Sequence, residues 1–316
     1  MRDFLTNLLS RLRLITAAFL GGSFAAVVPA NADPLTAAQI LTEFNAVIPG
    51  TFSTTSDVEG RLVAGTIANT TSSTFYAMPN PLSSASTYQA VNALTIASCP
   101  SCDVNNGGSV NFINSNAGNF NFNAGGGHPK GSLVRNSPPF VMSAFTNPLN
   151  TLETNLSTLM PNSTFNGTAF IVTPVNGVAV FDISTTDLDS LSNIAFINLS
   201  PSDTIIVNVT GTSFAQIANF NAPDATFNSH TIWNFEGATD LSFKFWHGAV
   251  LAGSASVTNS SPIEGFLYAK NFTGDGELHD FPFTPTLVPE PSTWALSMIA
   301  FGALGFLGWR RSTRRP

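Results

Sequence analysis

The chain has 316 residues, of which 10% are charged and 43% are hydrophobic, and its formal net charge is −7. This composition excludes an intrinsically disordered chain, which combines low hydrophobicity with high charge. It also argues against a nucleic-acid partner, because phosphate binding needs clustered lysine and arginine side chains. Soluble domains average roughly 25% charged residues, so we expect a surface covered by hydroxyl and amide groups.

Residues 1–32 have the organisation of a secretory signal peptide. Three arginines precede an apolar run over residues 14–28, and the small residues Ala30 and Ala32 follow it. A basic start, an apolar run and an Ala-x-Ala site together predict cleavage after Ala32 and export of the mature chain. The alternative is an N-terminal membrane anchor that is not cleaved.

A helix is predicted at the start of the exported body, over residues 33–48. Asp33 and Pro34 supply a capping carboxylate and a proline at the first helical position. Apolar residues then recur at helical spacing until Pro49-Gly50 ends the pattern. These residues are Ala37, Ile40, Leu41, Phe44, Val47 and Ile48.

The two cysteines of the chain lie in the sequence Cys99-Pro100-Ser101-Cys102. A thioredoxin-type redox role needs a thiolate at a helix N-terminus, whereas this motif lies between a β-like run and an Asn/Gly-rich loop. Zinc binding needs about four ligands, and the sequence has no second cysteine pair. For an exported protein we therefore predict a disulfide between Cys99 and Cys102, with redox and metal roles as alternatives.

Residues 105–127 are rich in asparagine and glycine, with alternating apolar positions at Val110, Phe112, Phe120 and Phe122. We predict a surface β-hairpin whose phenylalanines cover the core. The functional alternative is an adhesive hairpin that faces a ligand. The acidic glycine-rich repeats that bind calcium in other solenoids are absent from the sequence.

A second helix is predicted over residues 148–160, with Leu149, Leu152, Leu156 and Leu159 on one stripe. The remaining signals are short β-branched or aromatic runs separated by Asn, Gly, Ser, Asp and Pro. The predicted strands are residues 170–172, 178–181, 194–199, 204–209, 231–235 and 241–246.

Asp187-Leu188-Asp189 has the spacing of the start of a calcium loop. Leu191 occupies the next alternate position and no glycine follows, so the EF-hand pattern fails. We expect a turn with helix-capping carboxylates at this position.

Three segments share a pattern that predicts stacked coils. Residues 248–252 (Gly-Ala-Val-Leu-Ala) are followed closely by the similar residues 265–269 (Gly-Phe-Leu-Tyr-Ala), and residues 58–64 are similar to residues 263–269. In a β-solenoid each strand buries its apolar side chains against the next coil. The predicted fold class is therefore mainly β, a β-solenoid-like domain with one or two accessory helices, and a β-sandwich is the alternative.

The body, predicted over residues 33–288, resembles the choice-of-anchor A family most clearly at its two ends. Residues 56–65 are similar to the opening signature, and the closing signature is matched by residues 232–235, 238–239, 248–252, 263–265 and 276–283. Gly253-Ser254 replaces the usual Pro-Asn, and residues 98–131 resemble an insertion. The resemblance implies a secreted bacterial surface domain, and it implies no defined activity.

Residues 289–316 combine three elements at the end of the chain. Pro289, Glu290 and Pro291 precede an apolar segment over residues 294–309, and an arginine cluster follows. A helix of that length spans roughly 24 Å, slightly less than the ~30 Å hydrocarbon core, and the arginines favour a cytoplasmic C-terminus. A permanent C-terminal transmembrane helix is one interpretation of this segment.

The order of these elements resembles the PEP-CTERM sorting signal of Gram-negative bacteria. That resemblance implies handling by an exosortase-like membrane peptidase, with the membrane contacted through the C-terminal segment before processing. The same tail is also known as the ice-binding protein C-terminal domain, a label that does not establish ice binding.

We predict no catalytic residues, no cofactor and no metal site, because no catalytic motif is assembled. The four histidines fall in no His-Glu-x-x-His motif, and Gly-x-Ser-x-Gly is also absent. They are His128, His230, His247 and His279. Glu59 and Glu264, in equivalent Glu-Gly repeats, are expected to cap coils through backbone N–H groups rather than to act as the acid and base of a glycosidase.

These observations favour an exported, non-enzymatic cell-surface or extracellular-matrix protein associated with exopolysaccharide. Seven of the 12 cations but only two of the 19 acids lie in the two ends, so the body has a net charge of −12. The first alternative is an ice- or carbohydrate-binding module, although the threonines at 70–71, 185–186 and 210–212 share no coil spacing. The second is a secreted polysaccharide hydrolase, which needs a cleft with two facing carboxylates.

Overall fold

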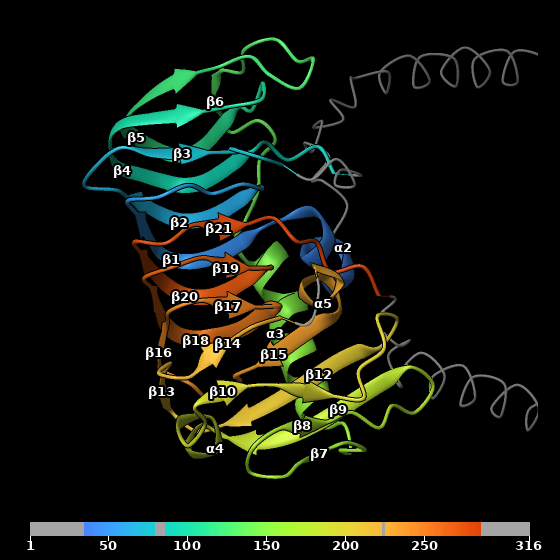
Figure 1. Ribbon diagram of the computed structural model, residues 1–316. Helices are drawn as coiled ribbons and strands as arrows, with labels where there is room; N and C mark the ends of the chain where they lie inside the picture. Colours follow the sequence, from blue (N-terminus) through green and yellow to red (C-terminus); the bar gives the residue numbers. More distant parts are fainter. Residues whose placement is uncertain (1–34, 80–85, 223–224, 286–316) are drawn as a thin grey trace, which may run out of the picture. The chain divides into compact units, whose positions relative to one another are not determined.

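The short apolar runs stack as parallel strands in the computed structural model of the chain (Figure 1). The structure describes residues 35–79, 86–222 and 225–285. The predicted signal peptide, sorting motif and C-terminal apolar segment lie outside these ranges. Over the described residues, no helix combines the length and the apolarity needed to cross a membrane.

The main sheet is built from strands that pair in the order β6-β5-β4-β2-β1-β20-β18-β15-β12-β9. Their bounds are β1 Ala46–Thr54, β2 Leu62–Ala68, β4 Val91–Val104, β5 Val110–Phe122, β6 Leu133–Arg135, β9 Val178–Ser184, β12 Thr204–Thr210, β15 Thr231–Asn234, β18 Ala249–Asn259 and β20 Leu267–Gly274. Every neighbouring pair in this order is parallel. This stacking confirms the mainly β, solenoid-like prediction, whereas a β-sandwich is built from antiparallel sheets.

Shorter strands complete the coils. They are β3 Ser73–Phe75, β7 Thr164–Phe165, β8 Phe170–Ile171, β10 Asn193–Ile194, β11 Phe196–Ile197, β13 Ser213–Ala215, β14 Asn219–Phe220, β16 Asp240–Phe243, β17 Trp246–His247, β19 Ile263–Glu264 and β21 Leu278–His279. The described helices are α2 Ala37–Glu43, α3 Ser143–Ser157, α4 Thr185–Asp189 and α5 Ala225–His230.

Each coil presents three faces, which are clearest in the coil formed by β18 and β19. Residues 249–251 of β18 pair with β15, and residues 256–259 pair with β16, so one strand serves two faces. The third face is formed by β19, which pairs with β17 and β21. We call these the helix face (249–252 and its neighbours), the hydroxyl face (254–259 and its neighbours) and the charged edge (263–264 and its neighbours).

The coils are not stacked in sequence order. Strands β1 to β6 form one block, and α3 then runs along the helix face, in contact with β1, β12, β15 and β18. The second block ends with β20 beside β1, so residues 46–54 meet residues 267–274. We call this boundary the seam, and it is visible in Figure 1 where the blue strand β1 lies beside the orange strand β20.

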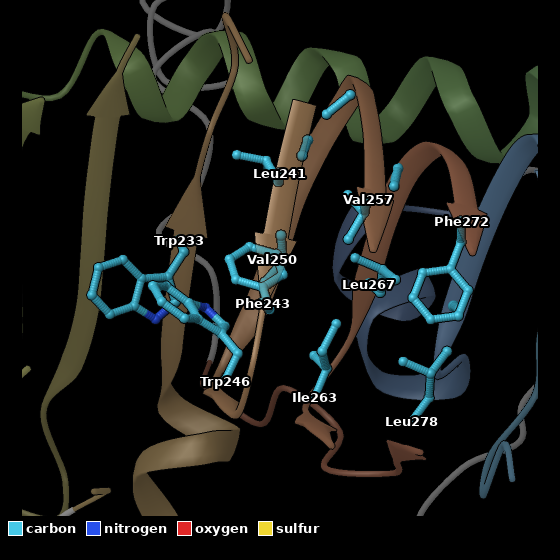
Figure 2. Packing of buried hydrophobic residues seen from close by; sticks show 14 of the residues in the cluster. Trp233, Leu241, Phe243, Trp246, Val250, Val257, Ile263, Leu267, Phe272 and Leu278 are labelled. Atoms are coloured by element: carbon cyan, nitrogen blue, oxygen red, sulfur yellow. The ribbon is translucent and has the colours of Figure 1, made fainter. Parts of the chain in front are cut away.

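Aromatic side chains stack inside the coils (Figure 2). The ring centroids of Trp233 and Trp246 are 4.8 Å apart, and those of Phe243 and Trp246 are 4.6 Å apart. Across the seam, Phe52 stacks on Phe272 at 5.4 Å. An interior with few hydrogen-bond partners favours phenylalanine over tyrosine, in agreement with 27 Phe and 3 Tyr in the chain.

Helix α3 buries one stripe against the helix face. Phe145, Leu149 and Leu156 belong to a second buried cluster, which also contains Leu251 from β18 and Tyr268 from β20. The cluster also contains Val47 of β1, which lies across the seam. Full burial of each such apolar side chain contributes about 1.5–3 kcal/mol, so the stripe attaches the helix to coils on both sides of the seam.

The two predicted helices are present with different bounds. Helix α2 ends at Glu43, and Thr36 rather than Asp33 caps it through a capping box with Gln39. Val47 and Ile48 belong to β1, where alternate side chains bury on opposite sides of the sheet. Because the start of β1 is apolar on both faces, its residues also fit helical spacing, and the predicted helix extends too far.

Helix α3 begins at Ser143 rather than at the predicted Pro148, which lies inside the helix. Phe145, which is fully buried, extends the packed stripe toward the helix N-terminus. Tertiary packing on the helix face thus overrides the expectation that proline marks the first turn.

The prediction of a hairpin over residues 105–127 is wrong. β5 pairs in parallel with β4 on one side and with β6 on the other. Its phenylalanines, Phe112, Phe120 and Phe122, pack half-buried against the interior core, which is the covering role expected for them.

Cys99 and Cys102 are disulfide-bonded, and both are buried. They lie inside β4 rather than before a loop. The pairing of β4 with β5 shifts register on both sides of Cys99, so the bond crosses an irregular part of the strand.

Glu153 is buried where α3 meets the corner of β18. The residue is only 5% exposed, and its Oε1 accepts the backbone N–H of Gly253 at 2.8 Å. Burial raises the pKa of Glu153 to about 7, with the Gly253 hydrogen bond opposing this shift and the nearby Glu236 adding to it. The folded protein therefore binds the Glu153 proton more tightly than the unfolded chain does.

We expect Glu153→Gln to remove part of the pH dependence of stability. In the wild type, protonation of Glu153 stabilises the fold at acidic pH, and this stabilisation is lost as the pH rises through about 7. Between pH 5 and pH 8 the wild type should lose about 2–3 kcal/mol more than the variant, measured by denaturant unfolding. Asp189→Asn, which removes an exposed carboxylate on α4, is the matched control, and an unchanged pH dependence in Glu153→Gln would contradict the assignment.

Candidate functional site

The hydroxyl face carries two rows of short side chains that run across the coils, and all of them are polar except Ala68 and Ala215. The first row is Ser213, Asp240, Ser256, Asn271, Thr51, Thr66, Thr95 and Ser115. The second row is Ala215, Ser242, Thr258, Thr273, Ser53, Ala68 and Ser98. All of these residues are exposed or half-buried. Both rows cross the seam without a gap, because Thr273 pairs with Ser53 and the N–H of Thr51 is donated to Asn271 Oδ1.

The spacing of the rows follows from strand geometry. Neighbouring parallel strands are about 4.8 Å apart, and residues i and i+2 of one strand are about 6.6 Å apart. The alternate residues point inward and are buried, among them Val257, Phe272, Phe52 and Ile67. The hydroxyl face is therefore a two-dimensional array of small, mostly polar side chains on an apolar base, and the register shifts of β4 make it irregular at that end.

Sequence spacing failed to reveal this array. The threonines at 70–71, 185–186 and 210–212 contribute nothing to the two rows. In the first row, Thr51, Thr66 and Thr95 are separated by unequal chain lengths, and Asn271 precedes Thr51 only across the seam. The usable signal was the alternation of small polar and apolar residues within one strand, as in Ser254-Ala255-Ser256-Val257-Thr258.

A hollow of ≈ 450 Å³ interrupts the array near β13, β16 and β18. Phe214 and Leu241 lie beneath it and are buried, at 4% and 3% exposure, and Asp189 and Asp240 contribute carboxylates. Ser242, Ser256 and Thr258 of the rows also border it. The exposed residues that border the hollow therefore carry hydroxyl or carboxylate groups, with the exception of Ala215.

The charged edge aligns histidines and glutamates from successive coils. His247 is paired with Glu264, and Glu264 is paired with His279. Val58 bridges to Leu278 across the seam, which places Glu59 beside His279. Histidine and glutamate thus alternate over four consecutive coil positions.

Contacts along this row are short. His247 Nδ1 lies 2.9 Å from Glu264 Oε2, and His279 Nδ1 lies 3.5 Å from Glu264 Oε1. Asn228 of α5 donates to Glu264 Oε2 at 2.6 Å. On the other side of its ring, His279 Nε2 lies 2.7 Å from Glu277 Oε2 and 3.9 Å from Glu59 Oε1.

These contacts shift the pKa values in opposite directions. The ion pair with Glu264, together with Glu277 and Glu59, raises the pKa of His279 to about 9 despite its burial. Burial opposes ionisation of Glu264, but hydrogen bonds from His247, His279 and Asn228 outweigh it and lower the pKa of Glu264. His279 is therefore a cation and Glu264 an anion at neutral pH.

The structure brings together two of the four histidines and both glutamates of the Glu-Gly repeats. Glu59 accepts the backbone N–H of Asp280 at 2.8 Å, as expected of a coil-capping carboxylate. Glu264 contacts the side chains of His247, His279 and Asn228 instead of a backbone N–H group. Because these contacts occupy its carboxylate, Glu264 is not placed to act as the base of a glycosidase.

His128, His230 and Asp187 lie elsewhere in the fold. His128 bridges to Gly125 in the loop after β5, and His230 Nδ1 is 2.9 Å from the Thr226 carbonyl oxygen. Asp187 caps α4 by accepting the N–H of Ser184 at 2.7 Å, which agrees with the expected capping turn.

Comparisons with known proteins identify two regions. Residues 37–280 match the family model described as "Putative Ice-binding-like adhesive domain". Residues 287–315 match the PEP-CTERM protein-sorting motif, which confirms that part of the sequence prediction. No curated protein matches the chain.

Two solved structures are similar to the chain. An ice-binding protein from an Antarctic biological consortium is 12% identical, with a TM-score of 0.38, and the match covers 78% of this chain and 90% of that one. An ice-binding protein from the Antarctic ascomycete Antarctomyces psychrotrophicus is 13% identical, with a TM-score of 0.32, and the match covers 80% of this chain and 100% of that one.

Proposed function

The chain belongs to the family of ice-binding-like adhesive domains, and from this premise we propose that it is an exported, non-enzymatic adhesin whose hydroxyl face binds exopolysaccharide. A PEP-CTERM motif following such a domain suggests an exported surface protein. The motif also implies processing by an exosortase-type membrane protein. The resemblance to the choice-of-anchor A family is part of the proposal, as are cleavage after Ala32 and a membrane-associated segment over residues 294–309.

The observation that carries the proposal is the pair of hydroxyl rows with the hollow beside them. A polysaccharide chain repeats hydroxyl groups along its length, and an array of serine, threonine and asparagine side chains offers donors and acceptors at regular intervals. The hollow adds a concave surface in which the carboxylates of Asp189 and Asp240 lie beside the hydroxyl groups of Ser242 and Ser256, and these groups can hydrogen-bond the hydroxyls of a sugar ring. An acidic body with few cations also favours a neutral partner over a polyanion.

Binding should fall at least tenfold when a bulky side chain stands on the hydroxyl face. The test variants are Thr258→Tyr at the hollow and Thr66→Tyr in the first row. At either position the tyrosine ring would project from the array and keep a ligand from lying against it. The probes are exopolysaccharide extracted from the producing culture and insoluble cellulose, used in co-sedimentation with the purified protein. Thr151→Tyr on α3, an exposed threonine outside this face, is the matched control.

Equal binding by the control and both test variants would contradict the assignment of this face. If only Thr258→Tyr lost polysaccharide binding, the binding site would be the hollow, and the rest of the array would not take part in binding.

Ice binding is the second candidate, and the regular spacing of the two rows favours it. An ice-binding face needs a flat array over many strands, whereas the hollow removes flatness at one end of this one. Thermal hysteresis of the purified protein separates the two functions. Hysteresis that disappears in Thr66→Tyr would replace the polysaccharide proposal by ice binding.

A further inference from the structure

The charged edge holds the side chains of a metal site where it crosses the seam. Glu59, Glu277 and His279 each offer one ligand atom, and these three atoms lie within 4.8 Å of one another. One ligand comes from the N-terminal block and two come from the last coil of the C-terminal block. Glu277 is the access point, because its side chain is 45% exposed, against 17% for Glu59 and 22% for His279.

A second carboxylate fixes the orientation of the imidazole. Glu264 faces Nδ1 of His279, which leaves Nε2 directed at Glu277 and Glu59. Metal-binding histidines commonly donate their other ring N–H to a carboxylate in this way, which sets the tautomer and the ring orientation. Glu264 is itself held by His247 and Asn228, so this support is rigid before any ion arrives.

The charge balance of the cluster also favours a cation. Glu59, Glu264 and Glu277 form their ion pairs within the described residues with His247 and His279. Two imidazoles carry fewer charges than three carboxylates even when both are protonated. The cluster therefore has an excess of negative charge, which a bound divalent cation would balance.

We infer that Glu59, Glu277 and His279 bind one divalent transition-metal ion of the zinc class, with Glu264 as the positioning residue. Such an ion is commonly bound by carboxylate and imidazole ligands, and water can fill the coordination positions that the two glutamates and the histidine leave open. Calcium is disfavoured because it takes oxygen ligands only. Because Glu59 lies near the start of the exported body and the other two ligands lie near its end, the ion connects the two blocks of coils at the seam.

Zinc titration by calorimetry tests this inference on the purified, chelator-treated protein without a polyhistidine tag. We expect one zinc ion per chain and a rise in melting temperature with added zinc. Glu277→Gln should weaken binding at least tenfold, and its exposure makes it the variant least expected to affect folding. Glu236→Gln, an exposed glutamate away from the cluster, is the matched control and should bind as the wild type does.

Further readouts distinguish a ligand from a positioning residue. Glu264→Gln should weaken zinc binding by about 10–100-fold without changing the number of ions bound. Cobalt in place of zinc should give visible absorption bands that change in Glu277→Gln. Zinc affinity equal in Glu277→Gln and wild type, or calcium binding tighter than zinc binding, would overturn the inference.

Discussion

Replacing Trp246 with alanine should lower the free energy of unfolding by about 3–5 kcal/mol. Trp246 is fully buried, and its ring lies 4.6 Å from Phe243, 4.8 Å from Trp233 and 5.2 Å from Phe220, measured between centroids. Trp233, Phe243 and Trp246 come from the three faces of one coil, and Phe220 comes from β14. The neighbouring rings cannot close the space because each is held by its own strand, so the loss includes the cost of a cavity as well as lost burial.

Denaturant unfolding followed by circular dichroism measures this loss. Trp246→Phe keeps most of the ring contacts and should lose much less stability than Trp246→Ala. Ile217→Ala is the control, since Ile217 is 65% exposed and should change stability by no more than about 0.5 kcal/mol. A loss in Trp246→Ala no larger than that of Ile217→Ala would show that the aromatic stack is not the centre of the core.

A Gly65→Ala substitution should cost about 3 kcal/mol, at the upper end of the range for overpacking. A Cβ atom at position 65 would lie 2.0 Å from the carbonyl oxygen of Pro49 and 2.8 Å from that of Gly50. Both contacts are with backbone, which cannot rotate away as a side chain can. The clash falls where β1 and β2 turn from the helix face to the hydroxyl face, at the register shift between Ile48 and Thr51.

The same substitution should weaken polysaccharide binding, because Gly65 precedes Thr66 of the first hydroxyl row. Thermal unfolding and co-sedimentation of one sample report both effects. Gly237→Ala is the control, since its nearest neighbouring atom would be 3.8 Å from the added Cβ. Wild-type stability in Gly65→Ala would mean that the corner is looser than these distances require.

Local patterns predicted the strand segments of the C-terminal block well. The runs at 178–181, 204–209 and 231–235 correspond to β9, β12 and β15, because each is a short β-branched or aromatic run between turn residues. The predicted strand over 241–246 is divided between β16 and β17, at the corner before Trp246. Corners are set by the coil as a whole, and a run of apolar residues does not mark them.

The secondary-structure predictions are wrong in two kinds of strand: one that is apolar on both faces, and one whose solvent-facing side is polar. Helical spacing predicts a helix through Val47 and Ile48, whereas both residues lie in β1 and bury on its opposite faces. The asparagine- and glycine-rich sequence of residues 105–127 predicts a hairpin, whereas β5 pairs in parallel with β4 and β6, which its polar outer face does not indicate. In both cases the missing information was the identity of the adjacent strand.

For the candidate sites, too, the sequence indicates individual residues but not which residues the fold brings together. Glu59 and Glu264 were recognised as related from their Glu-Gly repeats, and their equivalence holds because both occupy the charged edge. Their shared partner His279 was recognised separately, in the Glu277-Leu278-His279-Asp280 segment. No sequence spacing connects Glu59 to His279, because they lie near opposite ends of the body and only the pairing of Val58 with Leu278 brings them together.

The sequence by itself determined the composition of each coil, the polar character of the surface and the sorting motif at the end of the chain. These properties depend on residues close together in the chain, so hydrophobic period, turn residues and short motifs reveal them. The tertiary structure alone decided the order of the coils. Helix α3 carries the chain along the stack before the second block begins, so β20 closes against β1. The hydroxyl rows and the charged edge both cross that seam, and both exist only because parallel stacking aligns residues that no local interaction relates.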